Sequence, residues 1–225
     1  MQGRHIINPV ITDYTDVLYR PLSPDLEKLR AEAEEENLPV ILKDTERALA
    51  VLLRMRKPAR VLEIGTLVGY SACCFAALCG PDTEIVTLER DPEMVRRAQR
   101  NIEALGYRAQ VHIVEGDARE TIAGLDGPFE VVFIDAGKSH YREYWDAVLP
   151  LCADGAVIVC DNVLMRGAVV SEDYDSVPRR HRTSIRRMRA FLEYITGTED
   201  AETAVLTAGD GLAVSVVRRG GSGSS

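Results

Sequence analysis

The sequence predicts an α/β fold, a single domain built on a seven-stranded, mostly parallel sheet that ends in an antiparallel hairpin. Three observations support this prediction. Short apolar runs of strand length alternate with helical segments between about residues 60 and 160. These runs are continuously apolar, as expected for parallel strands that helices cover on both faces. The last two runs are separated only by a short glycine-containing turn, which favours a hairpin.

The bulk composition suits a globular domain with one sizeable core. The chain has 225 residues, of which 46% are hydrophobic and 28% charged, and its formal net charge is −8. An acidic surface, taken as a whole, repels nucleic acid and anionic membranes. No apolar run approaches the ~20 residues of a membrane span, and the N-terminus lacks the apolar core of a signal peptide. We therefore expect a cytoplasmic protein with no membrane partner.

Composition divides the chain into three parts. Residues 1–24 hold three prolines around a short amphipathic piece, Ile11–Tyr19, and are predicted to be an N-terminal extension that covers a site or a subunit interface. Residues 25–218 are predicted to form the folded domain. Residues 219–225 read as a flexible Gly/Ser tail. The five cysteines show no zinc-type spacing, so we expect them to be reduced and buried.

Apolar spacing predicts each element of the domain in turn. A helix is expected from Asp25 to about Glu36, and Asp44 is expected to cap the next helix. The expected strands are Arg60–Ile64, Glu84–Leu88, Val111–Val114, Glu130–Ile134, Ala156–Cys160, Ala204–Thr207 and Leu212–Val217. The helices between and after them are expected at Tyr70–Leu78, Pro92–Leu105, Ala118–Leu125, Tyr141–Leu149 and about His181–Ile195.

A glycine-containing turn follows the first predicted strand. Gly65 and Gly69 let the backbone turn sharply and approach a ligand closely. The helix after them offers unpaired N–H groups near Ser71, which suit a carboxylate. The spacing G-x-x-x-G differs from the G-x-G-x-x-G of dinucleotide enzymes, which disfavours an NAD-binding oxidoreductase. Taken alone, the turn is equally well explained as a structural one.

Acidic residues follow the next two strands. Glu89 ends the second strand, where α/β folds bind ribose hydroxyls, and Asp117 follows the third, within reach of an adenine amino group. The alternative role of Asp117 is to cap the helix that begins at Ala118. Three such elements at successive strand ends are more specific together than singly. They predict a cofactor site at the carboxyl edge of the sheet.

Polar side chains also follow the fourth and fifth strands. Asp135 and Lys138 come after the fourth, and Asp161 and Asn162 come after the fifth. Neighbouring strands bring these side chains together, and two close carboxylates repel each other unless a cation intervenes. An all-oxygen ligand set favours a hard divalent cation such as Mg²⁺ over zinc. The alternative, that Asp161 and Asn162 only start a loop, leaves Asp135 and Lys138 without a common explanation.

From about residue 38 to residue 218 the sequence resembles the cation-dependent O-methyltransferase family, which includes catechol and caffeoyl-CoA O-methyltransferases. The stretches that carry the resemblance are Val61–Ser71, Glu89, Gly116–Ala118, Phe133–Lys138 and Asp161-Asn162. The resemblance implies a single Rossmann-like class I methyltransferase domain over residues 25–218. It also implies S-adenosylmethionine as cofactor and a homodimer.

The same resemblance implies roles for individual positions. The positions matching Asp135, Asp161 and Asn162 bind Mg²⁺ or a similar hard divalent cation, and the one matching Lys138 acts on the acceptor hydroxyl. Lys138 and Asp135 are therefore the expected catalytic residues. The S-adenosylmethionine site is expected to comprise Glu63, Gly65, Ser71, Glu89, Asp117, Ala118 and Asp135, with backbone contacts near Ile41 and Leu42.

The chemistry of methyl transfer fits these residues. A neutral hydroxyl is a poor nucleophile at pH 7, and a bound Mg²⁺ lowers its pKa while Lys138 accepts its proton or stabilises the oxyanion. The cation binds best to a substrate with two adjacent oxygens. A catechol has them, and so does 5-hydroxyuridine, through its C5 hydroxyl and C4 carbonyl. The rival function class is a binding module that keeps the fold without catalysis.

A basic stretch points to the acceptor. It comprises Arg179, Arg180, Arg182, Arg186, Arg187 and Arg189, with His181 among them and Arg166 in the preceding loop. On a helix, Arg182, Arg186 and Arg189 share one face, and an apolar face that includes Leu192 lies opposite. Arginine suits bidentate contact with phosphate. The alternative is an ordinary solvated charged face.

A narrower similarity supports the RNA interpretation. Residues 161–167, 178–180 and 209–213, and the N-terminal extension that ends in Arg20-Pro21, look like the bacterial tRNA 5-hydroxyuridine methyltransferases. We therefore expect the partner to be a tRNA anticodon loop, in which the wobble 5-hydroxyuridine becomes 5-methoxyuridine. The alternative acceptor is a small catechol-type molecule with two adjacent hydroxyls.

Overall fold

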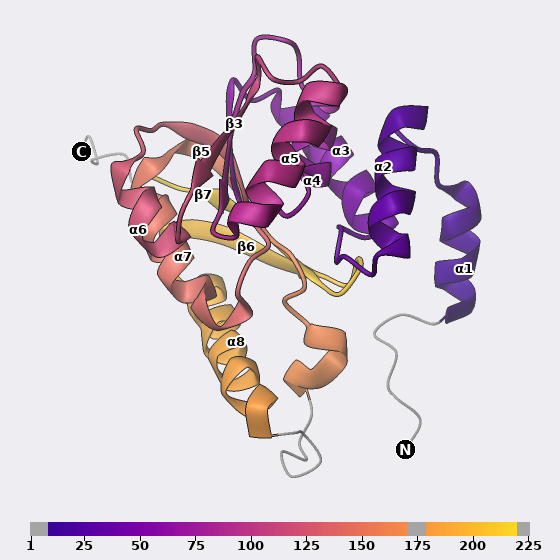
Figure 1. Ribbon diagram of the computed structural model, residues 1–225. Coiled ribbons are helices and arrows are strands. Elements are labelled where there is room, and N and C mark those ends of the chain that lie inside the picture. Colours follow the sequence, from indigo (N-terminus) through magenta and orange to yellow (C-terminus); the bar gives the residue numbers. More distant parts are fainter. Residues whose placement is uncertain (1–8, 171–178, 220–225) are drawn as a thin grey trace.

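A seven-stranded sheet runs through the centre of the molecule (Figure 1). The structure, a computed structural model, describes residues 9–170 and 179–219. The strand order is β3-β2-β1-β4-β5-β7-β6. The strands are β1 (Arg60–Ile64), β2 (Glu84–Glu89), β3 (Val111–Glu115), β4 (Phe129–Ile134), β5 (Cys152–Cys160), β6 (Ala201–Leu206) and β7 (Leu212–Val217).

The strand directions confirm the predicted fold class. Strands β1 to β5 pair in parallel, whereas β7 pairs antiparallel with both β5 and β6. The last strand of the chain therefore inserts between β5 and β6. Because β1 to β5 are parallel, their carboxyl ends meet at one edge of the sheet, and the order reverses beside β1, where such folds bind ligands.

Helices cover both faces of the sheet (Figure 1). Helices α2 to α5 pack on one face and α6 to α8 on the other. Their bounds are α1 (Pro9–Leu18), α2 (Pro24–Glu35), α3 (Lys43–Arg56), α4 (Tyr70–Leu78), α5 (Pro92–Ala104), α6 (Ala118–Thr121), α7 (Tyr141–Val148) and α8 (Arg179–Gly197). The described residues also form four short 3₁₀ segments, η1 (Ile122–Gly124), η2 (Lys138–His140), η3 (Leu149–Leu151) and η4 (Met165–Val170).

Alternating strand residues build two apolar cores, one on each face. In β4, Val131 and Phe133 face the core beneath α2 to α5, while Val132 and Ile134 face the core beneath α7 and α8. All four are at most 3% exposed. Continuous apolar strands are the direct consequence of burial on both faces, since successive side chains point to opposite sides.

Local signals explain where several helices begin. Ser23 accepts a hydrogen bond from the Leu26 backbone N–H and caps α2, and Asp91 caps α5 in the same way. In both helices a proline occupies the first turn, where its missing N–H costs nothing. The expected cap at Asp44 is wrong. Helix α3 begins after Leu42, and the Asp44 carboxylate instead accepts from the Gly209 backbone N–H, 2.5 Å away.

The structure corrects three further element predictions. The helix expected over Ala118–Leu125 is α-helical only to Thr121 and continues as the 3₁₀ segment η1. The first hairpin strand begins at Ala201, because its pairing with β7 extends further than its apolar pattern indicates. Strand β5 begins at Cys152, before the expected start at Ala156. All five cysteines are buried and unpaired, as expected. Within residues 9–170 and 179–219, no helix is long and apolar enough to cross a membrane.

Candidate active site

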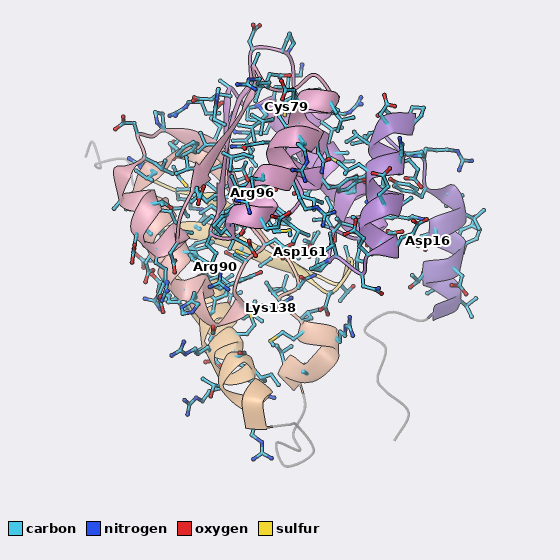
Figure 2. All side chains as sticks on the ribbon, viewed as in Figure 1. Asp16, Cys79, Arg90, Arg96, Lys138 and Asp161 are labelled. Atoms are coloured by element: carbon cyan, nitrogen blue, oxygen red, sulfur yellow. The ribbon has the colours of Figure 1, made fainter. Side chains whose placement is uncertain are left out.

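A cavity of about 1090 Å³ opens at the carboxyl edge of the sheet. Its walls come from the ends of β1 to β5, from residues 39–42 before α3, and from η4 and the β6–β7 turn. Figure 2 labels three of the lining residues, Arg90, Lys138 and Asp161, which lie in the middle of the molecule in this view. One cavity therefore joins nearly all the strand ends to which the sequence pointed.

The turn between β1 and α4 forms one wall. Gly65 has φ +107°, and a Cβ there would lie 2.2 Å from the backbone carbonyl oxygen of Asp135. Leu67 and Gly69 are also left-handed, which turns the chain into the first residue of α4. Only glycine permits β1 and β4 to approach so closely at Gly65. This close approach brings the predicted cofactor turn against the predicted metal-binding residue.

Glu63 lies behind this wall, fully buried, and does not line the cavity. The Ser71 hydroxyl donates to one of its carboxylate oxygens, and the Thr87 hydroxyl donates to the other at 2.5 Å. Burial raises the pKa of Glu63 to about 8, although the two hydroxyl donors oppose the shift. The sequence placed Glu63 in the cofactor site. In the structure Glu63 contacts Ser71, which does line the cavity, and a role of Glu63 in cofactor binding stays a prediction.

The raised pKa of Glu63 predicts a pH dependence of stability. In the unfolded chain this carboxyl titrates near 4.5, and in the folded chain near 8, so its stabilising contribution is complete below pH 4.5 and is lost as the pH rises to 8. Because a glutamine does not ionise, Glu63→Gln should abolish this pH-dependent decrease in the free energy of unfolding, which is on the order of a few kcal/mol. Urea unfolding of the cofactor-free protein at pH 5, 7 and 9 measures it. Equal pH slopes for Glu63→Gln and the parent would contradict the prediction.

Glu89 and Asp117 line the cavity, and both carboxylates accept hydrogen bonds from backbone N–H groups. Glu89 accepts from the backbone N–H groups of Leu67, Arg90 and Asp91 at 2.8 to 2.9 Å. It thereby ties the end of β2 to the β1–α4 turn. Each carboxylate oxygen has two lone pairs, so Glu89 keeps acceptor capacity for a ribose.

The alternative role considered for Asp117 is confirmed. Its carboxylate caps α6 through the Arg119 backbone N–H at 3.0 Å and binds the Arg119 guanidinium at 2.6 Å. These hydrogen bonds lower the pKa of Asp117 to about 2. Contact with adenine stays a prediction for Asp117 and for Ala118, which lines the cavity beside it. Ile41 and Leu42 line the same cavity.

The four residues predicted for metal binding and catalysis come together in the same cavity. The Lys138 ammonium donates to the Asn162 side-chain carbonyl at 2.8 Å. Asp161 is fully buried at the end of β5, and one of its oxygens accepts from the Asn162 backbone N–H at 2.6 Å. The other oxygen is buried without a hydrogen-bond partner among the described residues. A buried, unpaired carboxylate oxygen is costly unless a cation or proton meets it.

The electrostatics of this cluster fit a cation. Burial, and then the charge of Asp135, raises the pKa of Asp161 to about 7, and burial also raises the pKa of Asp135. Burial lowers the pKa of Lys138, against the pull of Asp135. The described residues include no group of three His, Cys, Asp or Glu side chains able to hold a metal. The set present is two carboxylates and one amide oxygen, which suits a hard ion.

Asp210 lies beside this cluster and was not predicted as a site residue. It lines the cavity from the β6–β7 turn, and its carboxylate accepts from the Arg166 backbone N–H. Burial raises the pKa of Asp210, and its charge acts on Lys138. The sequence marks this position by the turn 209–211, whose acidic residue sits between two glycines, and by the similarity noted over residues 209–213. Tyr144, Met165 and Ile185 also line the cavity without having been predicted.

The expected face of arginines available to phosphate, formed by Arg182, Arg186 and Arg189, is only partly present. Arg189 is half-buried, and its guanidinium donates to the Val169 carbonyl at 2.5 Å. Arg187 donates to the Ser139 carbonyl at 3.1 Å. Arg186 is exposed, Arg182 is half-buried, and Arg166 lines the cavity. The side chains of Arg179 and Arg180 lie outside the described residues. Arg189 is therefore turned toward η4, because carbonyls of irregular backbone need donors.

Known proteins are similar to this chain in sequence. A family model described as O-methyltransferase matches residues 19–219. The chain is 34% identical over 204 residues to a catechol O-methyltransferase of Mycobacterium tuberculosis, covering 87% of this chain and 89% of the relative.

Two solved structures also match. An O-methyltransferase of tomaymycin synthesis from Streptomyces achromogenes, in complex with S-adenosylmethionine, has a TM-score of 0.80 at 28% identity and covers 97% of this chain and 100% of that chain. An O-methyltransferase from Bacillus cereus in complex with S-adenosylhomocysteine has a TM-score of 0.80 at 26% identity, covering 93% and 97%. The chain belongs to the O-methyltransferase family and is an S-adenosylmethionine-dependent O-methyltransferase.

Proposed function

We propose that this enzyme methylates one hydroxyl of a small catechol-type molecule with the help of a divalent cation such as Mg²⁺. The observation that carries the proposal is the meeting of Lys138, Asp135, Asp161 and Asn162 in the cavity that also contains the cofactor turn. The name of the Mycobacterium tuberculosis relative supports the choice of acceptor. The orphaned oxygen of Asp161 supports the cation.

The residues divide into three roles. Asp135, Asp161 and Asn162 would hold the cation, which when bound lowers the pKa of the acceptor hydroxyl and favours two adjacent oxygens. Lys138 takes the proton of that hydroxyl, and its lowered pKa makes the neutral amine more accessible. The turn 65–71, Glu89 and residues 39–42 would bind S-adenosylmethionine. Apolar walls from Met165 and Ile185 would exclude water from the acceptor.

A tRNA acceptor presents the same two adjacent oxygens and stays a prediction. Its physical support was a row of arginines free to meet phosphate. Arg189, a member of that row, instead donates to the Val169 carbonyl, and the neighbouring Arg187 donates to the Ser139 carbonyl, which leaves fewer side chains for RNA. We therefore favour the small-molecule acceptor.

A direct assay distinguishes the acceptors. The protein is incubated with S-adenosylmethionine, Mg²⁺ and either catechol, resorcinol or undermodified tRNA, and products are identified by mass spectrometry. We expect the monomethyl ether of catechol and none of resorcinol, because its hydroxyls are not adjacent and cannot share one cation. Methylation of tRNA alone would overturn the proposed acceptor while keeping the chemistry. Absence of product from all three would overturn the proposed function.

Lys138→Ala should reduce turnover much more than cofactor affinity. Loss of a positioned base costs about 10²- to 10⁴-fold in rate. We expect kcat on catechol to fall within that range while the Kd of S-adenosylmethionine changes little, because Lys138 contacts Asn162 rather than the cofactor turn. Single-turnover kinetics and calorimetry measure the two quantities. A collapse of cofactor binding with turnover of the bound complex preserved would show that the assigned role is wrong.

We also propose that the enzyme is a homodimer and that helix α1 belongs to the interface. Val10 and Val17 are each 72% exposed and Tyr14 is 65% exposed, all on one face of α1. Figure 1 shows α1 at the outer edge of the molecule, beyond α2 and α3. A ten-residue helix is marginal in water without a packed apolar face. On α3, the exposed Val51 and Met55 extend the same apolar character.

Val17→Asp should therefore dissociate the dimer. A charge at the centre of an apolar interface loses its hydration without gaining a partner. Thr12→Asp, on the opposite face of α1, is the matched control and should leave the assembly unchanged. Light scattering after gel filtration measures the mass of each variant. A parent protein that is already monomeric, or a Val17→Asp protein that remains dimeric, would contradict this interface.

A further inference from the structure

We infer that Arg30, on helix α2 and outside the cavity, is a positioning residue for the cofactor half of the site. The inference rests on the proposed location of the S-adenosylmethionine site. Arg30 is 1% exposed and stands among the largest fully buried side chains of the described residues. Buried arginines are rare, and their five donors must all find partners. The partners of this one lead to the cavity wall.

The guanidinium of Arg30 binds two elements that line the cavity. It donates to the Ile41 backbone carbonyl at 2.9 Å and to the Tyr70 hydroxyl at 3.0 Å. Residues 38–42, which include Ile41, have no helix or strand of their own. Tyr70 is the first residue of α4, directly after the glycine-containing turn. One planar group therefore joins the irregular segment 39–42 to the start of helix α4, both of which line the cavity.

Glu46 makes this buried cation possible. Its carboxylate accepts from Arg30 at 2.7 Å, and both side chains are at most 2% exposed. The hydroxyls of Tyr70 and Tyr19 also donate to Glu46. A buried, hydrogen-bonded ion pair contributes little net stability compared with an apolar replacement, but it selects one arrangement of its neighbours. The arrangement selected here is that of the residues 39–42, which line the cavity.

The geometry requires an arginine. A guanidinium is a rigid fork that addresses the Ile41 carbonyl, Tyr70 and Glu46 in three fixed directions, whereas a lysine ammonium is a single point of charge. A lysine at this position keeps the ion pair with Glu46 but cannot also donate hydrogen bonds to both the Ile41 carbonyl and the Tyr70 hydroxyl. Arg30→Lys therefore tests the positioning role while leaving the buried carboxylate paired.

The experiment compares cofactor affinity with stability in four variants. Arg30→Lys and the double variant Arg30→Met/Glu46→Gln remove the three-way contact, the second without leaving a buried charge. Leu29→Ala is the matched structural control, because Leu29 is a buried neighbour on α2 with no bond to the cavity wall. Arg97→Met breaks an exposed ion pair between α5 and Glu36, after the end of α2. Calorimetry gives the Kd of S-adenosylmethionine, and urea unfolding gives stability.

We expect Arg30→Lys and the double variant to raise the Kd of S-adenosylmethionine on the order of 10-fold. This is the lower end of the effect seen when a residue that orients metal ligands is lost. Their kcat at saturating cofactor should change much less, since Lys138 and its neighbours are untouched. Leu29→Ala and Arg97→Met should bind as the parent does. Parent-like binding in both Arg30 variants, or equal weakening in Leu29→Ala, would overturn the inference. A parent protein that binds no S-adenosylmethionine would instead overturn the proposed site.

Discussion

Asp161→Ala is expected to reduce kcat/KM by about two to three orders of magnitude and to remove the response to Mg²⁺. A Lewis-acidic ion stabilises the transition state by several kcal/mol, and each ~1.4 kcal/mol is tenfold in rate. Asp161 is the fully buried member of the proposed ligand set, and its free oxygen has no partner among the described residues. Titration of the parent and the variant with Mg²⁺ after EDTA treatment measures the effect.

The stability of the same variant should move in the opposite direction. Burial and Asp135 raise the pKa of Asp161 to about 7, so above that pH the cation-free fold holds an unfavourable negative charge. Removing this carboxylate should stabilise the cation-free protein above pH 7, so the variant gains stability while it loses activity. Asp154→Ala is the control, an exposed carboxylate on the same strand. Full activity of the parent in excess EDTA, or parent-like activity of Asp161→Ala, would refute the metal role.

Gly65→Ala is expected to abolish cofactor binding and to destabilise the fold. The new Cβ would lie 2.2 Å from the Asp135 carbonyl oxygen, and real Cβ atoms essentially never approach within 3.0 Å of another atom. Backbone strain at positive φ costs about 1–3 kcal/mol, and overpacking typically costs about 1–3 kcal/mol more. To relieve the clash, β1 and β4 must separate at the point where the cofactor turn meets Asp135.

Two glycines separate the causes of that effect. Gly106 also has a positive φ of +80° but open space around its Cβ position, so Gly106→Ala reports backbone strain alone. Gly80 has neither feature, and Gly80→Ala should change stability by no more than about 0.5 kcal/mol. Urea unfolding and calorimetry with S-adenosylmethionine apply to all three. If Gly65→Ala reduced stability and cofactor affinity no more than Gly106→Ala does, the predicted effect of the close approach between β1 and β4 would be wrong.

Most of the fold could be predicted from the periodicity of apolar residues, and much of the site from the positions of polar residues after the predicted strands. The strands were predictable because burial on both faces requires continuous apolar runs, and the helices because an amphipathic face repeats every 3.6 residues. Asp135, Lys138, Asp161 and Asn162 could be grouped from sequence because parallel neighbouring strands end at one edge. Lys138 does reach Asn162, 24 residues away.

Contacts between side chains decided the rest. Arg30 and Tyr70 are 40 residues apart, and Asp210 and Arg166 are 44 apart, so neither pairing leaves a local pattern. Asp44 has the composition of a helix cap, yet it binds Gly209, because the β6–β7 turn lies against the start of α3.

The sequence by itself determined the order of elements, the sheet class and the chemistry at each strand end, since these follow from local spacing. The tertiary structure alone decided which polar groups satisfy one another. The insertion of β7 beside β5 brings Asp210 to the cavity, and the packing of α2 on α3 and α4 buries Arg30. A buried donor must take whatever acceptor the packed chain offers, and only the folded arrangement determines which acceptor that is.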